Sequence, residues 1–199
     1  MNSRRIITLV LAPMGAGKST FVRRMQARDV SVRHIDRDTI AGDALLRSTS
    51  SGRSLTIEDL LAAQAVGERQ FYAELESILS TSVPHVVVDY PPTYPAWAPR
   101  TVALARGAGR MVQLIGIRVD ALKCFDVARA RNANTLLGVA VDFDRNREMV
   151  RAWRLSYDLF PSQFCMAASL ADTAYLYENQ FTGGKMWRVA QWRRAVSAG

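Results

Sequence analysis

Short apolar runs rich in β-branched residues alternate along the chain with longer segments whose apolar positions recur every three to four residues. The apolar runs, which predict strands, are Arg5–Ala12, Val30–Ile35, His85–Asp89, Met111–Val119 and Thr173–Tyr177. The segments that predict helices are Lys18–Ala27, Thr56–Ser80, Trp97–Ala108, Asp120–Arg131 and Phe143–Tyr157. This alternation favours an α/β fold of three layers, in which helices cover both faces of a mostly parallel five-stranded sheet.

The first apolar run leads into a glycine-rich turn, and a helical pattern follows directly. Together they have the spacing of a phosphate-binding P-loop, formed by Gly15, Ala16, Gly17, Lys18, Ser19 and Thr20. The glycines let successive backbone N–H groups surround phosphate oxygens, and the start of the helix adds its dipole. We expect Lys18 to reach the β- and γ-phosphates of a nucleotide and the Ser19 hydroxyl to help hold Mg²⁺. The pattern usually begins with glycine where this chain has Ala12, another small residue.

Two other interpretations of this segment are weaker. Arg4 and Arg5 before an apolar run are compatible with a signal peptide, but the run Ile6–Ala12 is short for one, and cleavage would remove most of the motif. A glycine-rich turn without a ligand is the other alternative, and the strand before it and the helix after it argue against that. We therefore expect a nucleotide-binding protein.

Carboxylates follow the second and third predicted strands, where ligands bind in parallel sheets. Asp36 and Asp38 follow the second run, and we expect one of them, preferentially Asp38, to accept the proton of an attacking hydroxyl. Capping of a helix that starts at Thr39 is the alternative role for Asp38. Asp89 ends the third run in the pattern of a Walker B strand, which makes it a candidate to bind the metal through water or to orient the nucleophile. The alternative for Asp89 is to cap the next turn.

A proline-rich loop with three aromatic residues follows Asp89 and runs from Tyr90 to Trp97. Proline restricts the backbone and so lowers the entropy lost when a binding loop is held in place. Thr93 and Tyr94 are candidate substrate contacts in this loop. Its aromatic rings either stack on a flat ligand or pack the loop against the domain, and the sequence leaves both roles open.

Basic side chains follow the fourth predicted strand. Arg129 and Arg131 lie where a lid, at about residues 129–147, would fold over a bound nucleotide. An arginine supplied to the transferring phosphoryl group accelerates such reactions by ~10³–10⁵. Both arginines are therefore candidate catalytic residues.

The composition is that of a globular protein. The chain has 199 residues, of which 49% are hydrophobic, and predicts one domain over residues 1–199. No apolar run approaches the ~18 residues of a membrane span, so we expect no membrane partner. Cys124 and Cys165 lie far apart and only His34 and His85 are present, so we expect a cytoplasmic protein without a zinc site and assign neither histidine a role.

The net charge is +8, and 23 of the 26 basic residues are arginine. An arginine excess suits the recognition of phosphate, in an acidic substrate or a nucleic acid. Residues 185–194 interleave basic side chains with Trp187 and Trp192, a composition typical of surfaces that contact a nucleic-acid backbone and stack on its bases, so DNA is a possible partner. The favoured alternative is an amphipathic helix over about residues 184–197 that docks Trp187 on the core.

Taken together, these residues resemble the zeta-toxin-like branch of small P-loop kinases. The stretches that carry the resemblance, of which the first two are specific, are Gly15–Ser19, Ile35–Thr39 and Tyr175–Asn179. The resemblance implies a three-layer P-loop kinase fold with a small lid, and it implies ATP and Mg²⁺ as cofactors. Tyr177 and Asn179 are similar to the segment that lines the adenine side in that family.

The resemblance also implies catalytic and substrate-binding roles. Asp38 matches the carboxylate that acts as a base toward a substrate hydroxyl, and Asp36 accompanies it in the same motif. Glu74 lies near the position of a glutamate that helps hold the substrate. Arg129 or Arg131 matches a lid arginine that aids phosphoryl transfer.

The chain departs from the family pattern in the acceptor region. Residues 89–93 stand where zeta toxins have Glu-Gly-Thr, and Leu136 or Leu137 stands where a second substrate-binding arginine is expected. We therefore expect an ATP-dependent kinase that phosphorylates a hydroxyl of a small metabolite or a nucleotide sugar, with an acceptor different from that of the zeta toxins. Two alternatives stay open, namely a kinase acting on a hydroxymethylpyrimidine base in DNA and a nucleotide-binding regulator without turnover.

Overall fold

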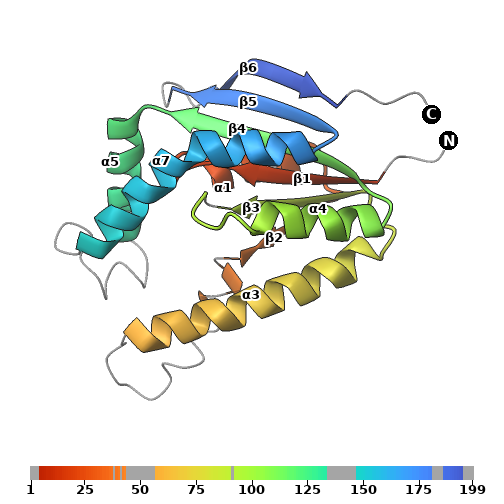
Figure 1. The fold of residues 1–199 in the computed structure, drawn as a ribbon, viewed down its shortest axis with the longest axis horizontal. Helices are drawn as coiled ribbons and strands as arrows, with labels where there is room; N and C mark the ends of the chain where they lie inside the picture. Colours follow the sequence, from red (N-terminus) through yellow and green to blue (C-terminus); the bar gives the residue numbers. More distant parts are fainter. Residues whose placement is uncertain are drawn as a thin grey trace.

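A six-stranded sheet forms the centre of the molecule (Figure 1). The structure is a computed structural model that describes residues 5–37, 39–40, 42–43, 57–90, 92–133, 147–180 and 186–194. Its strands are β1 (Ile6–Leu11), β2 (Val32–Asp36), β3 (His85–Tyr90), β4 (Met111–Val119), β5 (Thr173–Asn179) and β6 (Met186–Arg193). The helices are α1 (Lys18–Arg28), α3 (Ile57–Leu79), α4 (Trp97–Gly107), α5 (Ala121–Ala133) and α7 (Arg147–Leu170).

The strands lie in the order β2-β3-β1-β4-β5-β6. β1 is central and pairs in parallel with β3 and β4, while β5 and β6 pair in antiparallel orientation. The carboxyl ends of the five parallel strands therefore meet at one edge, which lies at the left in Figure 1. This arrangement confirms the predicted α/β class with a mostly parallel sheet, although the sheet has six strands and not five.

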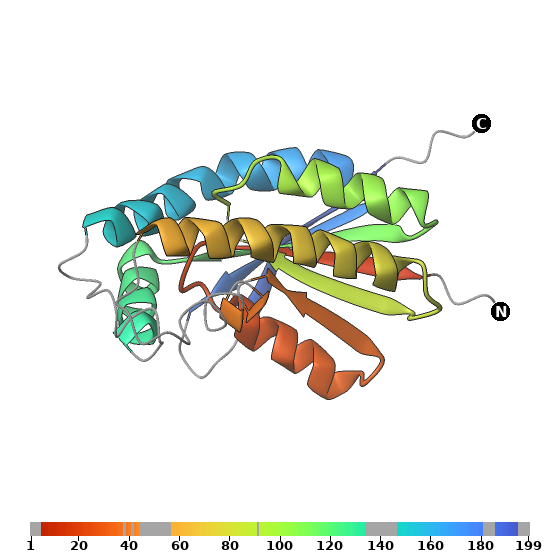
Figure 2. The same ribbon diagram turned by 90° about the horizontal axis from the view of Figure 1, so that it is seen from below.

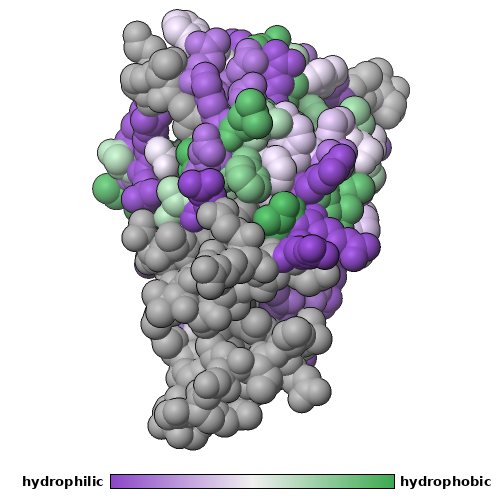
Figure 3. All heavy atoms as spheres, turned by 90° about the vertical axis from the view of Figure 1, so that its left-hand side faces the viewer, coloured by the Kyte–Doolittle hydropathy of each residue, from purple (hydrophilic) through white to green (hydrophobic). Residues whose placement is uncertain are grey.

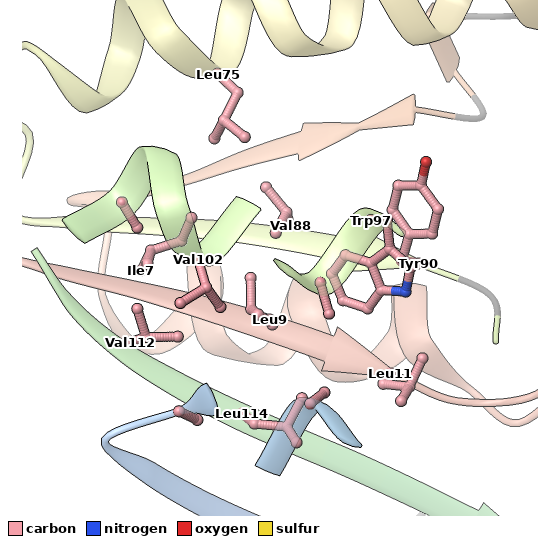
Figure 4. Close-up of a cluster of buried hydrophobic side chains, with 14 of the residues drawn as sticks. Ile7, Leu9, Leu11, Leu75, Val88, Tyr90, Trp97, Val102, Val112 and Leu114 are labelled. Carbon is pink, nitrogen blue, oxygen red and sulfur yellow. The ribbon is translucent and has the colours of Figure 1, made fainter. Parts of the chain in front are cut away.

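Alternate residues of β1 face two different layers of helices. Ile7 and Leu9 pack in a core with α3, α4 and α7, whereas Val10 packs on the other face beneath α1. Figure 2 shows α3, α4 and α7 running alongside one another, with α1 apart from them. In Figure 4, Leu75 of α3 points toward Val88 and the sheet. Each large aliphatic side chain buried in this way stabilises the fold by about 1.5–3 kcal/mol.

The C-terminal segment differs from its prediction. The helix expected over about residues 184–197 is wrong for the part that the structure describes, because Met186–Arg193 form β6 and pair with β5. Trp187, Val189 and Trp192 are residue types that favour strands. The edge of β5 offers them unpaired backbone N–H and C=O groups, and this pairing outweighs the amphipathic helical pattern.

The last helix is longer than its pattern indicated. The prediction ended at Tyr157, but α7 continues through Pro161 to Leu170. Proline normally ends a helix because it removes one hydrogen bond and crowds the preceding turn. Beyond it, Phe164 packs so closely on β4 that a Cβ added to Gly116 would lie 2.4 Å from its ring. Tertiary packing thus outweighs the local cost of the proline.

Within the described ranges, no helix combines the length and the apolar character that crossing a membrane requires.

Candidate active site

The turn between β1 and α1 has a backbone that only glycine adopts readily. Gly15 has φ 85° and Gly17 has φ 96°, both in the left-handed region. Neighbouring segments also approach both residues closely. An added Cβ would lie 2.3 Å from the carbonyl oxygen of Cys124 at Gly15 and 2.9 Å from Nδ2 of Asn179 at Gly17. Both glycines of the motif are therefore required by conformation and by space.

Three side chains from distant segments hold this turn. Asn179 Nδ2, buried at the end of β5, donates to the Ala16 carbonyl at 3.0 Å. The Cys124 thiol in α5 donates to the Met14 carbonyl at 2.8 Å, and the Met14 N–H donates to Ser156 Oγ in α7 at 3.2 Å. Burial raises the pKa of Cys124 to about 11, which keeps the thiol protonated and able to donate. Sequence reasoning missed Cys124 and Ser156, because neither belongs to a motif.

Lys18 is the cation of this turn. Its Nζ donates to the carbonyls of Ala12 at 2.8 Å and Pro13 at 3.1 Å. The ammonium group is thus held against the loop. Ser19 and Thr20 follow Lys18 in the first turn of α1, so the loop leads directly into the N-terminus of this helix. A curled loop, a lysine and a helix N-terminus together form a place for an anion with several phosphate groups.

Carboxylates from the two strands beyond β1 stand beside the loop. Asp89 in β3 pairs in register with Val10 of β1 on one side and with Asp36 of β2 on the other. Asp36 also caps the next turn, since its carboxylate accepts hydrogen bonds from the Thr39 hydroxyl at 2.8 Å and from the Thr39 N–H at 3.4 Å. Asp36 thus takes the capping role that the sequence left as an alternative for Asp38, and Asp38 itself lies outside the described residues.

A histidine to which the sequence assigned no role binds Asp89. Nε2 of His34 lies 2.6 Å from Oδ1 of Asp89, and since a carboxylate only accepts, the ring donates. Burial acts to lower the pKa of His34, but the hydrogen bond and charge of Asp89, with the charge of Asp36, raise it overall. The spacing His34-x-Asp36 at the end of a strand was the signal available, because these two residues share one face of β2.

The proline-rich loop is anchored through Arg37, the residue between the two carboxylates of the motif. The Arg37 side chain is buried, its Nη2 donates to the Tyr94 hydroxyl at 3.1 Å, and its guanidinium lies 4.4 Å from the centre of the Tyr94 ring. Tyr90 and Trp97 stack on each other at 4.5 Å and are buried in the core. The sequence left open whether the aromatic rings of this loop stack on a ligand or pack the loop against the domain. Tyr90 and Trp97 pack the loop against the domain.

A family model described as an AAA domain matches residues 8–160 of the chain. The chain belongs to this AAA domain family. The match begins in β1 and includes the phosphate-binding turn and the carboxylates Asp36 and Asp89 at the ends of β2 and β3. No curated protein sequence matches the chain.

Several solved structures share the fold of this AAA domain. A protein of the PezAT chromosomal toxin–antitoxin system of Streptococcus pneumoniae has a TM-score of 0.67 at 14% identity, covering 99% of this chain and 76% of that one. AvrRxo1-ORF1:ORF2 with ATP has a TM-score of 0.60 at 13% identity, over 96% of this chain. A Chloroflexus aurantiacus protein described as a kinase has a TM-score of 0.56 at 13% identity, covering 77% of this chain and 76% of that one. The chain spans 59% of the AvrRxo1 protein, less than two thirds of its length.

The sequence led us to expect a zeta-toxin-like P-loop kinase, and the matches test that expectation. The resemblance to zeta-toxin-like P-loop kinases is confirmed in the fold, which the chain shares with a toxin–antitoxin protein and with a protein described as a kinase. At this level of identity, the likeness concerns the arrangement of the chain and not the substrate.

Some of the remaining predicted site residues lie near the carboxyl ends of the parallel strands, and others do not. Figure 3 looks onto the edge, where hydrophilic and hydrophobic side chains of the described residues are interspersed. Thr93 and Tyr94 are half-buried in the loop after β3. Arg129 is exposed on α5, Arg131 lies in the same helix, and residues 134–146 of the expected lid fall outside the described part. Tyr177 in β5 lies against Phe21 of α1, with ring centroids 5.5 Å apart.

Glu74 lies along α3, away from the end of the helix that contacts the proline-rich loop. It is exposed on α3, ten residues after Gln64, whose side chain is 3.5 Å from the Tyr94 hydroxyl. Ten residues of helix span ~15 Å. Glu68 is nearer, and its charge adds to burial in raising the pKa of Tyr90. The position of a glutamate on a long helix is not fixed by the sequence alone.

Proposed function

We propose that this AAA domain is an ATP-dependent kinase that transfers the γ-phosphoryl group to a hydroxyl of a small metabolite or nucleotide sugar. The observation that carries the proposal is the position of the carboxylates. Asp89 and Asp36 are in register with Val10, two residues before the phosphate-binding turn begins. Strands are ~4.8 Å apart, so the two carboxylates stand about one and two strand spacings from β1. Nucleotide binding alone would require no carboxylate base beside Asp89, the proposed metal ligand.

The proposed reaction is an in-line displacement. Asp38, the second carboxylate of the motif, accepts the proton of the acceptor hydroxyl while that oxygen forms a bond to the γ-phosphorus and the bond to ADP breaks. Lys18 leaves the carbonyls of Ala12 and Pro13 and neutralises charge on the β- and γ-phosphates. Arg129 and Arg131 of α5 supply further positive charge to the transferring group.

The donor side of the proposal rests on the turn itself and on one relative. The turn has the backbone conformation of a phosphate cradle, and AvrRxo1-ORF1:ORF2, which shares the fold, has been solved with ATP. Tyr177 and Asn179 lie on the β5 side of the turn, where the adenine is proposed to bind. Asn179 also supports the Ala16 carbonyl.

The residues present suit Mg²⁺ of the kind that accompanies nucleotides. Among the described residues, no three His, Cys, Asp or Glu side chains gather as a dedicated metal cage. Mg²⁺ at phosphotransfer sites typically has one or two protein ligands and binds phosphate oxygens and water as well. Ser19 and Asp89 are the residues that would hold it, and when bound it would neutralise charge on the phosphates.

The position of the basic tail favours a small acceptor over DNA. β6 and β2 lie on opposite edges of the sheet, five strand spacings or ~24 Å apart. The arginines of β6 therefore do not border the carboxylates on which a hydroxyl would be activated. The loop held by Arg37 and Tyr94 does border them, and it is the proposed wall of the acceptor site.

Transfer of label from γ-labelled ATP tests the function. The protein is incubated with ATP and Mg²⁺ together with UDP-sugars and small alcohols, duplex DNA containing hydroxymethyluracil, or unmodified DNA. Label is expected in the small-molecule pool. Label only in the modified DNA would establish the DNA kinase instead. ATP binding without label in any acceptor, including the pool, would favour the regulator.

Two substitutions separate the base from nucleotide binding. Asp38→Asn is expected to abolish transfer and to leave ATP affinity nearly unchanged, because the carboxylate acts on the acceptor. Asp43→Asn is the matched control, since Asp43 is exposed five residues further on. Equal loss of ATP binding and transfer in Asp38→Asn would contradict the assignment of the base.

A further inference from the structure

β6 forms one edge of the sheet and exposes several large apolar side chains. It is the last strand in the order, and none of the described helices or strands lies beyond it (Figure 1). Trp187, Val189 and Trp192 are 55%, 43% and 46% exposed. β2, at the other edge, carries no exposed large apolar side chain. An open edge with exposed apolar side chains is a surface on which another strand pairs readily.

The backbone of β6 directs hydrogen-bonding groups at this edge. The Arg194 N–H donates to the Asp172 carbonyl at 3.0 Å, on the β5 side. Alternate residues of an antiparallel strand direct their N–H and C=O groups to the same side. Trp192 therefore also bonds toward β5, whereas Gln191 and Arg193 direct their backbone groups at the open edge. These donors and acceptors are placed to pair with one further strand.

The face of β6 that lies toward α1 is basic. Directly opposite residues of paired strands share a face of the sheet, and so do alternate residues of one strand. Arg188 lies opposite Tyr177, whose ring packs against α1, and Arg193 lies opposite Thr173 on the same face. Both arginines are exposed, and β6 contains no acidic residue. This face therefore presents two positive charges beside the open edge.

The face of β6 that lies toward α7 is aromatic. The Trp192 ring centroid is 5.5 Å from that of Phe164 in α7. Trp187 lies opposite Glu178, the neighbour of Tyr177 in β5, so its side chain is on the face away from α1. The two faces of this strand thus differ in chemistry, with arginine on one and tryptophan on the other.

A bulge brings the two tryptophans to one face. Trp187 and Trp192 are five residues apart, and a regular strand would place them on opposite faces. The register of the β5–β6 pair shifts so that Val189 is an additional residue in β6. A partner strand that follows β6 as β5 does would therefore alternate strictly. Every second residue of it would face the arginines, and the residues between would face the tryptophans.

We propose that the β6 edge binds an extended segment of a partner protein in which acidic and apolar residues alternate. The segment adds an antiparallel seventh strand to the sheet. Its acidic residues face Arg188 and Arg193, and its apolar residues face Trp187 and Trp192. Main-chain hydrogen bonds supply affinity in such strand addition, and the alternate side chains supply specificity. None of these four residues is assigned to phosphotransfer, so the inference goes beyond the proposed function.

The charge of the protein favours an acidic segment over a second copy of this chain. Arginines on an open edge oppose pairing with an identical edge, because like charges on facing strands repel each other. The net charge of +8 acts in the same direction. An acidic segment is attracted by both.

Fluorescence anisotropy with a labelled eight-residue peptide of alternating glutamate and valine measures the binding. A peptide of alternating lysine and valine is expected to show no binding. A third peptide, with four glutamates followed by four valines, has the same charge and composition as the first. It is expected to lose most of the affinity, because its acidic and apolar residues no longer lie on separate faces.

Methylation of the peptide backbone tests the strand pairing. In the proposed register the glutamates lie opposite Gln191 and Arg193, so their N–H groups point to β6 and those of the valines point away. N-methylation of the two central glutamates is expected to weaken binding by about fivefold or more, the effect of two lost hydrogen bonds. The same modification at the two central valines is the matched control and should change the affinity little.

Charge reversal in the protein tests the assignment of residues. An opposite-charge pair across strands is worth about 1.4-fold or more, so two lost attractions and two new repulsions should weaken binding by about fourfold or more. Arg188→Glu with Arg193→Glu is expected to show this loss with the glutamate peptide and to bind the lysine peptide instead. Arg69→Glu with Arg151→Glu is the matched control, because these exposed arginines lie on α3 and α7.

Four results would overturn the inference. Equal losses in the edge pair and in the control pair would reduce the binding to general surface charge. Equal effects of N-methylation at glutamate and at valine would exclude the strand pairing. Absence of binding by a protein whose circular dichroism is that of the folded chain would exclude the site. In light scattering, a dimer that Trp187→Lys converts to a monomer would assign the edge to a second copy.

Discussion

His34 and Asp89 join the ends of β2 and β3, with Nε2 of the histidine 2.6 Å from Oδ1 of the carboxylate. The pair lies between the phosphate-binding turn on one side and Asp36 on the other. One oxygen of the Asp89 carboxylate, Oδ1, is thus held in place by the His34 ring. The other histidine, His85, lies at the opposite end of β3, where its Nε2 is 2.8 Å from the hydroxyl of the buried Thr8.

The two histidines are expected to titrate in opposite directions from the ordinary pKa of 6.5. Asp89 and Asp36 outweigh burial and raise the pKa of His34, whereas burial lowers the pKa of His85 against a weaker opposing effect of Asp29. NMR titration of the ring protons without added metal measures both, since the chain has only these two histidines. Asp89→Asn should bring the His34 pKa down and leave that of His85 in place. A His34 pKa at or below 6.5 in the unaltered protein would contradict the pairing.

The same shifts fix the sign of the pH dependence of stability. The His34 pair contributes stability that is fully present below pH 6.5 and is lost as the pH rises through the raised folded-state pKa. His85 has the reverse effect, because stability falls as the pH drops from 6.5 through its lowered folded-state pKa. Urea unfolding should therefore show the destabilisation by His34→Asn shrinking between pH 6 and 8. A constant difference across that range would argue against the linkage.

Gly15→Ala is expected to abolish nucleotide binding. Its φ of 85° costs a non-glycine residue about 1–3 kcal/mol, and the new methyl group would meet the Cys124 carbonyl at 2.3 Å. Isothermal titration with ATP measures the loss. Gly107→Ala is the matched control, because a Cβ at Gly107 in α4 meets no described atom within 4 Å. Unchanged ATP affinity in Gly15→Ala would show that the turn does not hold the nucleotide.

Asn179→Ala is expected to weaken ATP binding about tenfold, because the Ala16 carbonyl loses its donor and the turn loses one of its anchors. Asn179→Asp should weaken ATP binding at least as much, since a carboxylate cannot donate a hydrogen bond to a carbonyl. Glu178→Gln, at the residue immediately before Asn179, is the matched control. It breaks only a half-exposed ion pair with Arg118 and should change the affinity little.

Arg37→Ala is expected to raise KM for the acceptor and leave that for ATP unchanged. The substitution removes the hydrogen bond to Tyr94 and the guanidinium above its ring, which together tie the proline-rich loop to the end of β2. Arg37→Lys keeps the positive charge and should therefore raise KM for the acceptor less than Arg37→Ala does. Steady-state kinetics with each substrate varied in turn separates the two constants, and an equal rise in both would point to general disorder of the site.

Arg110→Met is expected to destabilise the fold by about 2–5 kcal/mol. The buried Arg110 guanidinium donates to four carbonyls at the end of α3 and in the turn after it, those of Ile78, Leu79, Thr81 and Val83. Chemical denaturation measures the change. Arg106→Met, at an exposed arginine with one carbonyl partner, should cost about 1 kcal/mol or less. Similar costs for both would mean that the four bonds add no stability.

The sequence by itself determined the layered α/β fold, the phosphate-binding turn and the carboxylates at the strand ends. These features follow from local patterns: apolar runs that alternate with helical periodicity, and glycines at spacings that a phosphate requires. Asp36 and Asp89 could be placed at one edge because the carboxyl ends of parallel strands necessarily meet there.

Only the tertiary structure decided what these residues contact. The pairing of His34 with Asp89, the support of the turn by Cys124 and Ser156, and the packing of Arg37 on Tyr94 join segments far apart in the chain. It also decided that the basic tail is a strand, because the open edge of β5 supplied partners that no local pattern contains. For residues other than proline, local propensity is a weak term of about 1 kcal/mol or less per residue, and contacts between distant segments outweigh it.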